Sequence, residues 1–99
     1  MEKTLIKKCS EIFTVLADEK SLKITLSLAK EEKSFKRLAK DTMLPENELE
    51  EKIVDLVESN ILRYKNDKDT FVLADAHVCA LVRNVEDKAN AEIFRECEF

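Results

Sequence analysis

The sequence has no glycine and no tryptophan, and it contains one proline, Pro45, and one histidine, His77. Without glycine there is no glycine-rich loop of the kind that binds nucleotide phosphates. One histidine, with no paired base and nucleophile, leaves no recognisable catalytic arrangement. We therefore expect a protein that is not an enzyme. Because Gly and Pro are the usual markers of turns, the ends of helices must be found from capping residues and periodicity.

Long apolar runs are also missing. No stretch approaches the roughly 20 apolar residues of a membrane helix, and Lys3, Lys7 and Lys8 are not followed by the apolar run of a signal peptide. We expect a cytoplasmic protein with no membrane contact. At 99 residues, with 44% hydrophobic and 38% charged residues, the chain is long enough for one small core. Residues 1–99 are therefore predicted to form a single domain.

Cysteines are few. Cys9, Cys79 and Cys97 are odd in number and show no CxxC spacing, which argues against a disulfide framework and a zinc finger. We expect reduced thiols and no cofactor, with Cys9 and Cys79 as small core residues and Cys97 as an idle thiol near the tail. A soft-metal or redox effector bound through these cysteines is the alternative, because thiolates favour such ions.

Helical periodicity and capping residues organise the first half of the chain. Apolar residues recur at steps of three and four over residues 5–16, which predicts a first helix. Asp18 can cap a second helix over about residues 19–30, and Ser34 can cap a short third helix. Pro45 fits the first turn of a fourth helix, where its missing N–H would have had no partner.

The second half of the chain continues with a hairpin. Asn60 suits the left-handed residue that ends the fourth helix. Residues 61–65 and 70–73 are predicted strands, joined by turn-forming residues. Asp75 can cap a last helix over about residues 76–95. The predicted fold is mainly α with a small β-hairpin, in the helices–hairpin–helix order of a winged helix-turn-helix.

Three blocks of the sequence, within about residues 12–90, also carry a family resemblance. They are Phe13 to Asp18 with Leu22-Lys-Ile24, then Leu44 to Leu62, then Leu73 to Leu81. Together they resemble the ArsR/SmtB family of bacterial transcriptional repressors. The middle block is similar to the family's recognition-helix block, with Asn60 where the family usually has glycine. The last block is similar to the start of the final helix in the zinc-sensing branch.

The resemblance implies a homodimeric, DNA-binding transcriptional regulator of the repressor type, with an unknown inducer and with operator DNA as partner. It also implies that the first and last helices form the dimer interface, while the third and fourth form the helix-turn-helix. The broad apolar faces of the first and last helices are consistent with this dimer interface. So small a domain cannot bury both faces alone, so a second copy would cover them. The residues predicted for the dimer interface are Leu5, Cys9, Ile12, Val78, Leu81, Val82 and Val85.

The charge of the predicted DNA-binding surface is unfavourable. The net charge is -4, and the recognition helix starts with four glutamates against one lysine, which would repel phosphate. Cations on the wing and in the block 30–40, a solvated basic face, could hold a complex dominated by backbone contacts. The residues predicted to bind DNA are Lys36, Arg37, Lys40, Asn47, Glu48, Glu51, Lys52, Arg63, Lys65 and Lys68. The alternative is a winged-helix adaptor that does not bind DNA and whose acidic fourth helix docks a basic protein partner.

The resemblance also points to a metal site, which this sequence fills only in part. Asp75 and His77 match the acid and histidine that the zinc-sensing branch carries at the start of its last helix. The two ligands from the partner helix would fall at Lys88 and Ala91, which cannot ligate zinc. We therefore expect Asp75 to act as a helix cap and His77 to lie partly buried near the dimer seam. The family's other metal site needs cysteines at the start of the third helix, and residues 33–36 contain none.

Overall fold

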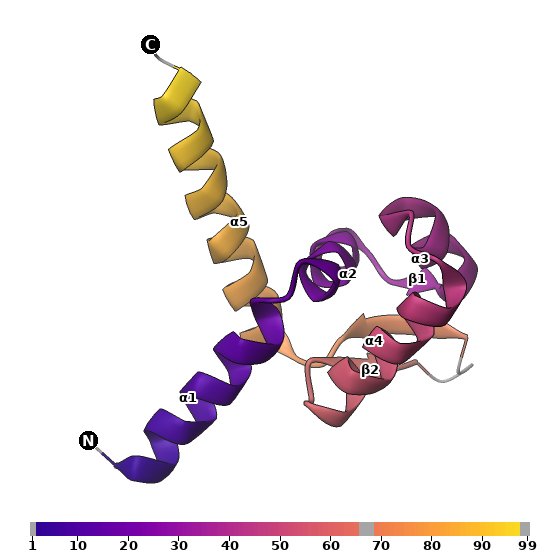
Figure 1. Ribbon diagram of the computed structural model, residues 1–99, viewed down its shortest axis with the longest axis horizontal. Helices are drawn as coiled ribbons and strands as arrows, with labels where there is room; N and C mark the ends of the chain where they lie inside the picture. Colours follow the sequence, from indigo (N-terminus) through magenta and orange to yellow (C-terminus); the bar gives the residue numbers. More distant parts are fainter. Residues whose placement is uncertain (1, 66–68, 98–99) are drawn as a thin grey trace.

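The computed structural model describes residues 2–65 and 69–97. Over these residues it has five helices and a small antiparallel sheet, with the strands before and after the third and fourth helices (Figure 1). The predicted turn at residues 66–68, and with it Lys68, lies outside the described residues. The elements are α1 (Lys3–Leu16), α2 (Glu19–Lys30), β1 (Lys33–Ser34), α3 (Phe35–Thr42), α4 (Glu46–Glu58), β2 (Leu62–Tyr64), β3 (Thr70–Leu73) and α5 (Ala76–Cys97).

Side-chain caps begin three of the helices, and this prediction is confirmed. At the start of α2 the Asp18 carboxylate accepts the Ser21 backbone N–H at 3.0 Å. At the start of α3 the Ser34 hydroxyl accepts the Arg37 N–H at 3.2 Å. Asp75 accepts a backbone N–H of the first turn of α5 at 2.9 Å. Each cap satisfies a donor that the helix itself leaves unpaired, so it fixes where the helix begins.

Two residues adopt the left-handed backbone conformation that glycine usually adopts at the ends of helices. Asn60 (φ 61°) follows α4 as predicted, and Met43 (φ 59°), which no sequence signal marked, ends α3. The prediction that Pro45 lies in the first turn of α4 is wrong by one residue. Pro45 occupies the cap position with ψ 144°, and its carbonyl accepts the Leu49 N–H at 2.9 Å. The fixed φ of proline is compatible with both positions, so φ alone could not separate them.

The sheet has three strands where two were predicted. β2 and β3 form the hairpin of the wing, with Leu62 opposite Leu73 and Tyr64 opposite Phe71. The additional strand, β1, pairs antiparallel with the other edge of β3, so the order is β1-β3-β2. A strand of two residues is too short to show an alternating pattern, and its partner is far away in sequence. The sequence therefore gave no local signal for it.

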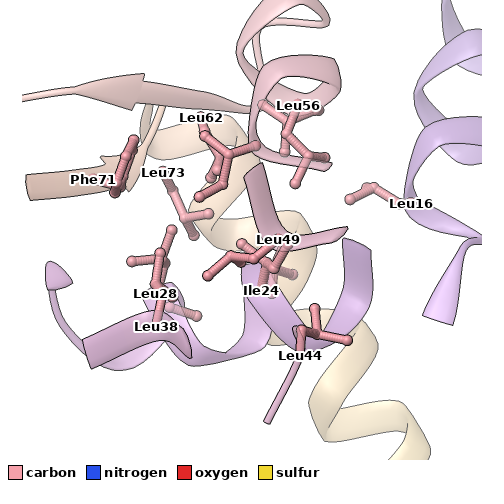
Figure 2. Close-up of a cluster of buried hydrophobic side chains, with 14 residues drawn as sticks. Leu16, Ile24, Leu28, Leu38, Leu44, Leu49, Leu56, Leu62, Phe71 and Leu73 are labelled. Atoms are coloured by element: carbon pink, nitrogen blue, oxygen red, sulfur yellow. The ribbon is translucent and has the colours of Figure 1, made fainter. Parts of the chain in front are cut away.

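The core lies where α2, α3 and α4 meet the sheet. Ile24, Leu38, Leu49 and Leu56 are each 0% exposed and come from these three helices. Figure 2 shows leucines of the helices pointing toward the strand residues Leu62, Leu73 and Phe71. Leu16, at the end of α1, and Val82 of α5 close the cluster. We refer to this compact part, residues 16–65 and 69–82, as the body.

Two helical arms leave the body. They are residues 3–14 of α1 and residues 85–97 of α5, and they diverge from a common base beside α2 (Figure 1). α5 runs without a break from the end of β3 in the body to the tip of its arm. None of the described helices combines the length and apolar character needed to cross a membrane. The arms nevertheless expose large apolar side chains, which are Leu5, Ile6, Ile12 and Phe13 on α1, and Val85, Ile93 and Phe94 on α5.

Candidate nucleic-acid interface

The cations of α3 differ in how freely they reach solvent. Lys36 and Lys40 are exposed and make no side-chain hydrogen bond or ion pair within residues 2–65 and 69–97. Arg37 is exposed as well, but its guanidinium lies 3.1 Å from Glu31 and 3.8 Å from Asp41. The two lysines are thus available to a phosphate backbone, while Arg37 is already shared between two carboxylates.

Lys33 is buried, so the prediction that the whole block 30–40 is a solvated basic face is wrong. Its ammonium donates to the Ser27 hydroxyl at 2.8 Å and to the Asp41 carboxylate at 2.6 Å. These bonds tie β1 to α2 and α3. The hydrogen bond from Lys33 holds the pKa of Asp41 below its usual value, and the charges of Lys33 and Arg37 act in the same direction. We refer to these side chains as the Lys33 clasp.

Two predicted DNA-binding residues of α4 are paired with the start of α2. The Lys20 ammonium donates to Glu48 at 2.7 Å, and this hydrogen bond raises the pKa of Lys20. Lys52 lies 3.3 Å from Asp18, whose pKa is lowered mainly by the Ser21 backbone N–H and further by Lys52. Glu48 and Lys52 are half-buried. Their ion pairs with Lys20 and Asp18 hold both side chains toward α2, and their contact with DNA stays a prediction.

The solvent face of α4 carries the other predicted residues. Asn47 and Glu51 are exposed and line a shallow hollow of about 650 Å³ together with Glu50, Lys52, Val54 and Asp55. Val54 is 45% exposed. Asn47 is the one residue here whose side chain both donates and accepts hydrogen bonds, as base recognition requires. The carboxylates around it face solvent where a duplex would present phosphate.

The wing contributes two described cations. Arg63 is exposed and makes no side-chain ion pair within the described ranges. Lys65 is exposed too, and its ammonium donates to Glu32, which precedes β1. The third predicted cation of the wing, Lys68, lies outside the described residues. Arg63 is therefore the side chain of the described wing that is most available to phosphate.

The residues predicted for a dimer interface divide into three groups. Leu5, Cys9, Ile12 and Val85 are exposed, and Val78 and Leu81 are half-buried. Val82 is 3% exposed and packs in the core of the body, so little of its side chain is available to a partner. The prediction missed Ile6, Phe13, Ile93 and Phe94, which are exposed on the arms. Their exposure depends on how the arms leave the body, which helical periodicity alone does not reveal.

An apolar groove lies at the base of the arms. It has a volume of about 310 Å³, and it brings residues of α1, α2 and α5 together. Phe13, at 61% exposure, stands at this groove and reaches into solvent. The lining residues are Phe13, Leu16, Ala17, Leu22, Leu81, Val82 and Val85. Phe13 and Val85 belong both to the groove and to the exposed apolar residues of the arms, so the groove joins the bases of the two arms.

The residues predicted for metal or thiol chemistry lie on α1, on α5 and directly before α5. Asp75 uses its Oδ1 to cap α5, and His77 is exposed in the single chain, so its partial burial near a dimer seam stays a prediction. Lys88, at one of the partner-ligand positions, forms an ion pair with Glu92 at 2.6 Å. Cys9 and Cys97 are exposed, whereas Cys79 is half-buried and packs against the core. The described residues contain no group of three side chains suited to bind a metal.

The element order and packing define a winged helix-turn-helix fold, with α3 and α4 joined by a tight turn and the β2–β3 wing following. Solved structures of this fold are similar to the chain at a TM-score of 0.78. One is the homodimeric winged helix-turn-helix DNA-binding domain of Mb0332 from Mycobacterium bovis, a possible ArsR-family transcriptional regulator, with 18% identity over 91% of this chain and 85% of that chain. A second is HlyU from Vibrio cholerae, with 21% identity over 88% of this chain and 96% of that chain.

A third is the transcriptional repressor BigR from Xylella fastidiosa, with 21% identity over 91% of each chain. No protein-family model matches the chain, and no curated protein matches it in a sequence search. The likeness is therefore one of three-dimensional structure, and it establishes the fold that the sequence predicted.

Proposed function

We propose that this chain is a DNA-binding transcriptional regulator of the repressor type that acts as a homodimer on operator DNA. The observation that carries the proposal is the likeness, over 91% of the chain, to a homodimeric DNA-binding domain and to a transcriptional repressor. A regulator of this kind works in the cytoplasm, together with its DNA. The proposal includes no catalytic role and no cofactor.

The arms support the dimer. Phe13, Ile93 and Phe94 are 61%, 56% and 69% exposed, and each arm is a single helix that cannot bury them on its own. A second copy offers the same residues, and a two-fold axis brings like surfaces together. We propose that the partner's arms cover this surface and fill the apolar groove at its base. Leu5, Cys9, Ile12 and Val85 belong to the proposed interface, with Val78 and Leu81 at its margin.

The DNA contacts proposed for this dimer are mainly with the phosphate backbone. Lys36 and Lys40 on α3 and Arg63 on the wing are exposed cations without an ion pair in the described parts of the chain. Arg37 and Lys65 add charge that is partly compensated by acids. Asn47 and Glu51 are the proposed base-facing residues of α4. The phosphate contacts of the cations fix the position of a protein on DNA but carry little sequence information, which base contacts supply.

A salt titration of DNA binding tests the proposal. The probe is a labelled duplex from the promoter region of the chain's own gene, and the readout is fluorescence anisotropy. Lys36→Ala with Lys40→Ala should weaken binding to all duplexes, and the slope of log K against log salt should fall by about two. The matched control, Lys88→Ala with Arg95→Ala, removes the same charge from the α5 arm and should leave the slope unchanged. A wild-type protein that binds no duplex at low salt would overturn the proposal.

A further inference from the structure

A second hollow lies between α4 and the wing, on the face proposed to meet DNA. It has a volume of about 290 Å³. Its lining consists of Glu50 and five apolar or aromatic residues, which are Phe35, Ile53, Val54, Tyr64 and Phe71. The rings of Tyr64 and Phe71 lie 5.0 Å apart, yet Tyr64 remains 46% exposed. We refer to this hollow as the α4–wing notch, and it has the size and lining to accept one large apolar side chain.

The notch opens beside the acidic hollow of α4. The two hollows share Glu50 and Val54, so apolar floor and carboxylates belong to one continuous surface. Three of the residues that line this surface are acids, Glu50, Glu51 and Asp55. The cation among them, Lys52, lies 3.3 Å from Asp18 and is already compensated. The surface therefore combines an apolar anchor point with a negative rim.

Within the described residues, the carboxylates of this rim form no ion pair, although the charge of Glu51 helps to raise the pKa of Lys20. α4 carries six acids, and among the described residues only Glu48 forms an ion pair. Some acids elsewhere in the body are paired with cations distant in sequence, as Asp41 with Lys33 and Glu32 with Lys65. Opposite DNA, three unpaired carboxylates would face phosphates and raise the free energy of the complex. Opposite a cationic segment, the same charges would be complementary.

We propose that the α4–wing notch and its acidic rim bind a cationic amphipathic segment of a partner protein. One large apolar side chain of that segment fills the notch, and lysines or arginines beside it meet Glu50, Glu51 and Asp55. The segment occupies the exposed face of α4, so the partner and a DNA duplex exclude each other. This exclusion rests on the proposed function, whereas the docking itself does not. The partner then acts as an antagonist that releases the regulator from its operator.

The experiment measures binding of a fluorescein-labelled helical peptide of leucine and lysine to the full chain by anisotropy. Glu50→Gln, Glu51→Gln and Asp55→Asn together should raise the Kd by about tenfold, the sum expected for three exposed ion pairs. The matched control neutralises three acids of α5, Glu86→Gln, Asp87→Asn and Glu96→Gln, and should leave the Kd within about twofold. A peptide with serine in place of leucine should lose binding to the unaltered protein, which tests the notch without any variant that could misfold.

Several results would overturn the proposal. Equal weakening by the two triple variants would show that the peptide responds only to net charge. A serine peptide that binds as well as the leucine peptide would remove the role of the notch. A mass above that of a dimer in light scattering, lost in the rim variant, would identify a second copy as the occupant. No peptide binding by the wild type would end the docking proposal.

Competition separates this proposal from the proposed function. With the promoter duplex bound, added peptide should release the duplex at concentrations near its own Kd. Simultaneous binding of both would overturn the exclusion. If the wild type binds the peptide through the rim but binds no duplex, the DNA-binding proposal fails and the docking proposal stands.

Discussion

The body and the arms treat large apolar side chains in opposite ways. In the body, Ile24, Leu38, Leu49 and Leu56 are completely buried by neighbours from other elements. On the arms, Phe94 is 69% exposed, although a phenylalanine gains free energy from burial as a leucine does. The body therefore buries its large apolar residues within one chain, whereas the arms leave theirs exposed, as the proposed dimer would require.

The ion pairs also differ between the body and the arms. In the body several ion pairs join different elements, as Lys20 of α2 with Glu48 of α4, so they fix how the helices lie against each other, and Arg37 with Asp41 is a pair within one helix. On the arms the ion pairs of the described residues all join positions three or four apart on one helix, as Lys88 with Glu92. Such pairs support a helix but not its packing. The comparison supports the proposal that the arms are assembly surfaces.

The largest effect is expected from a cavity in the body. Leu49→Ala should lower the free energy of unfolding by about 2–5 kcal/mol, because the site is fully buried between three helices and the sheet. In so small a domain this is a large part of the total stability. Urea unfolding followed by circular dichroism measures it. A loss below about 1 kcal/mol would show that Leu49 is not a central part of the core.

A change on the arms should act on assembly instead. Phe13→Ser with Phe94→Ser should raise the dimer dissociation constant on the order of a hundredfold or more, since a symmetric interface loses each phenylalanine twice. Light scattering over a concentration series gives the mass, and the helical signal of the body should persist. Asn90→Ser on the α5 arm is the control and should leave the mass unchanged. If the double variant stays a dimer at every concentration, the interface does not use these residues.

The smallest effect is expected from the Lys33 clasp. Asp41→Asn should destabilise the body at neutral pH, though less than Leu49→Ala, because asparagine can still accept a hydrogen bond from Lys33 but carries no charge. The pKa of Asp41 is lower in the folded state than its usual value of 3.8. The ionised carboxylate therefore stabilises the fold at pH values above 3.8. That contribution is lost as the pH falls through the lowered pKa.

Unfolding of the wild type and of Asp41→Asn, measured from pH 7 down to pH 3, checks the expectation. The two curves should approach each other as the pH falls toward the acid end of the range and Asp41 begins to take up a proton. Asp87→Asn on the α5 arm is the control and should track the wild type throughout. A difference between Asp41→Asn and the wild type that does not change with pH would show that the charge of Asp41 is irrelevant.

Local signals in the sequence predicted much of the fold. The caps Asp18, Ser34 and Asp75 and the left-handed Asn60 were predicted because each acts on its own helix within a few residues. β1 was missed because its pairing depends on β3, which the chain reaches only after two further helices. Local periodicity carries no information about such a contact.

The candidate site was less predictable for the same reason. Glu48 and Lys20 are 28 positions apart, and nothing in either segment indicates that they meet. Lys33 has the sequence neighbourhood of an exposed lysine, and only the packing of β1 against α2 and α3 buries it. Composition did predict the acidic face of α4, since that property belongs to the helix itself. Which carboxylates remain unpaired depended on tertiary structure.

The unbroken course of α5 has a mechanical consequence. Its 22 residues extend for about 33 Å at about 1.5 Å per residue, with one end anchored beside the sheet and the other at the tip of an arm. A rigid rod of that length is a lever, and a tilt of about 5° at its base moves its tip by about 3 Å. In a dimer joined at the arms, a movement at the tips of the arms would in turn tilt the bodies. A small slide between the two tips becomes a rotation of each body, which changes the distance between the two α4 helices and hence their match to the spacing of a duplex.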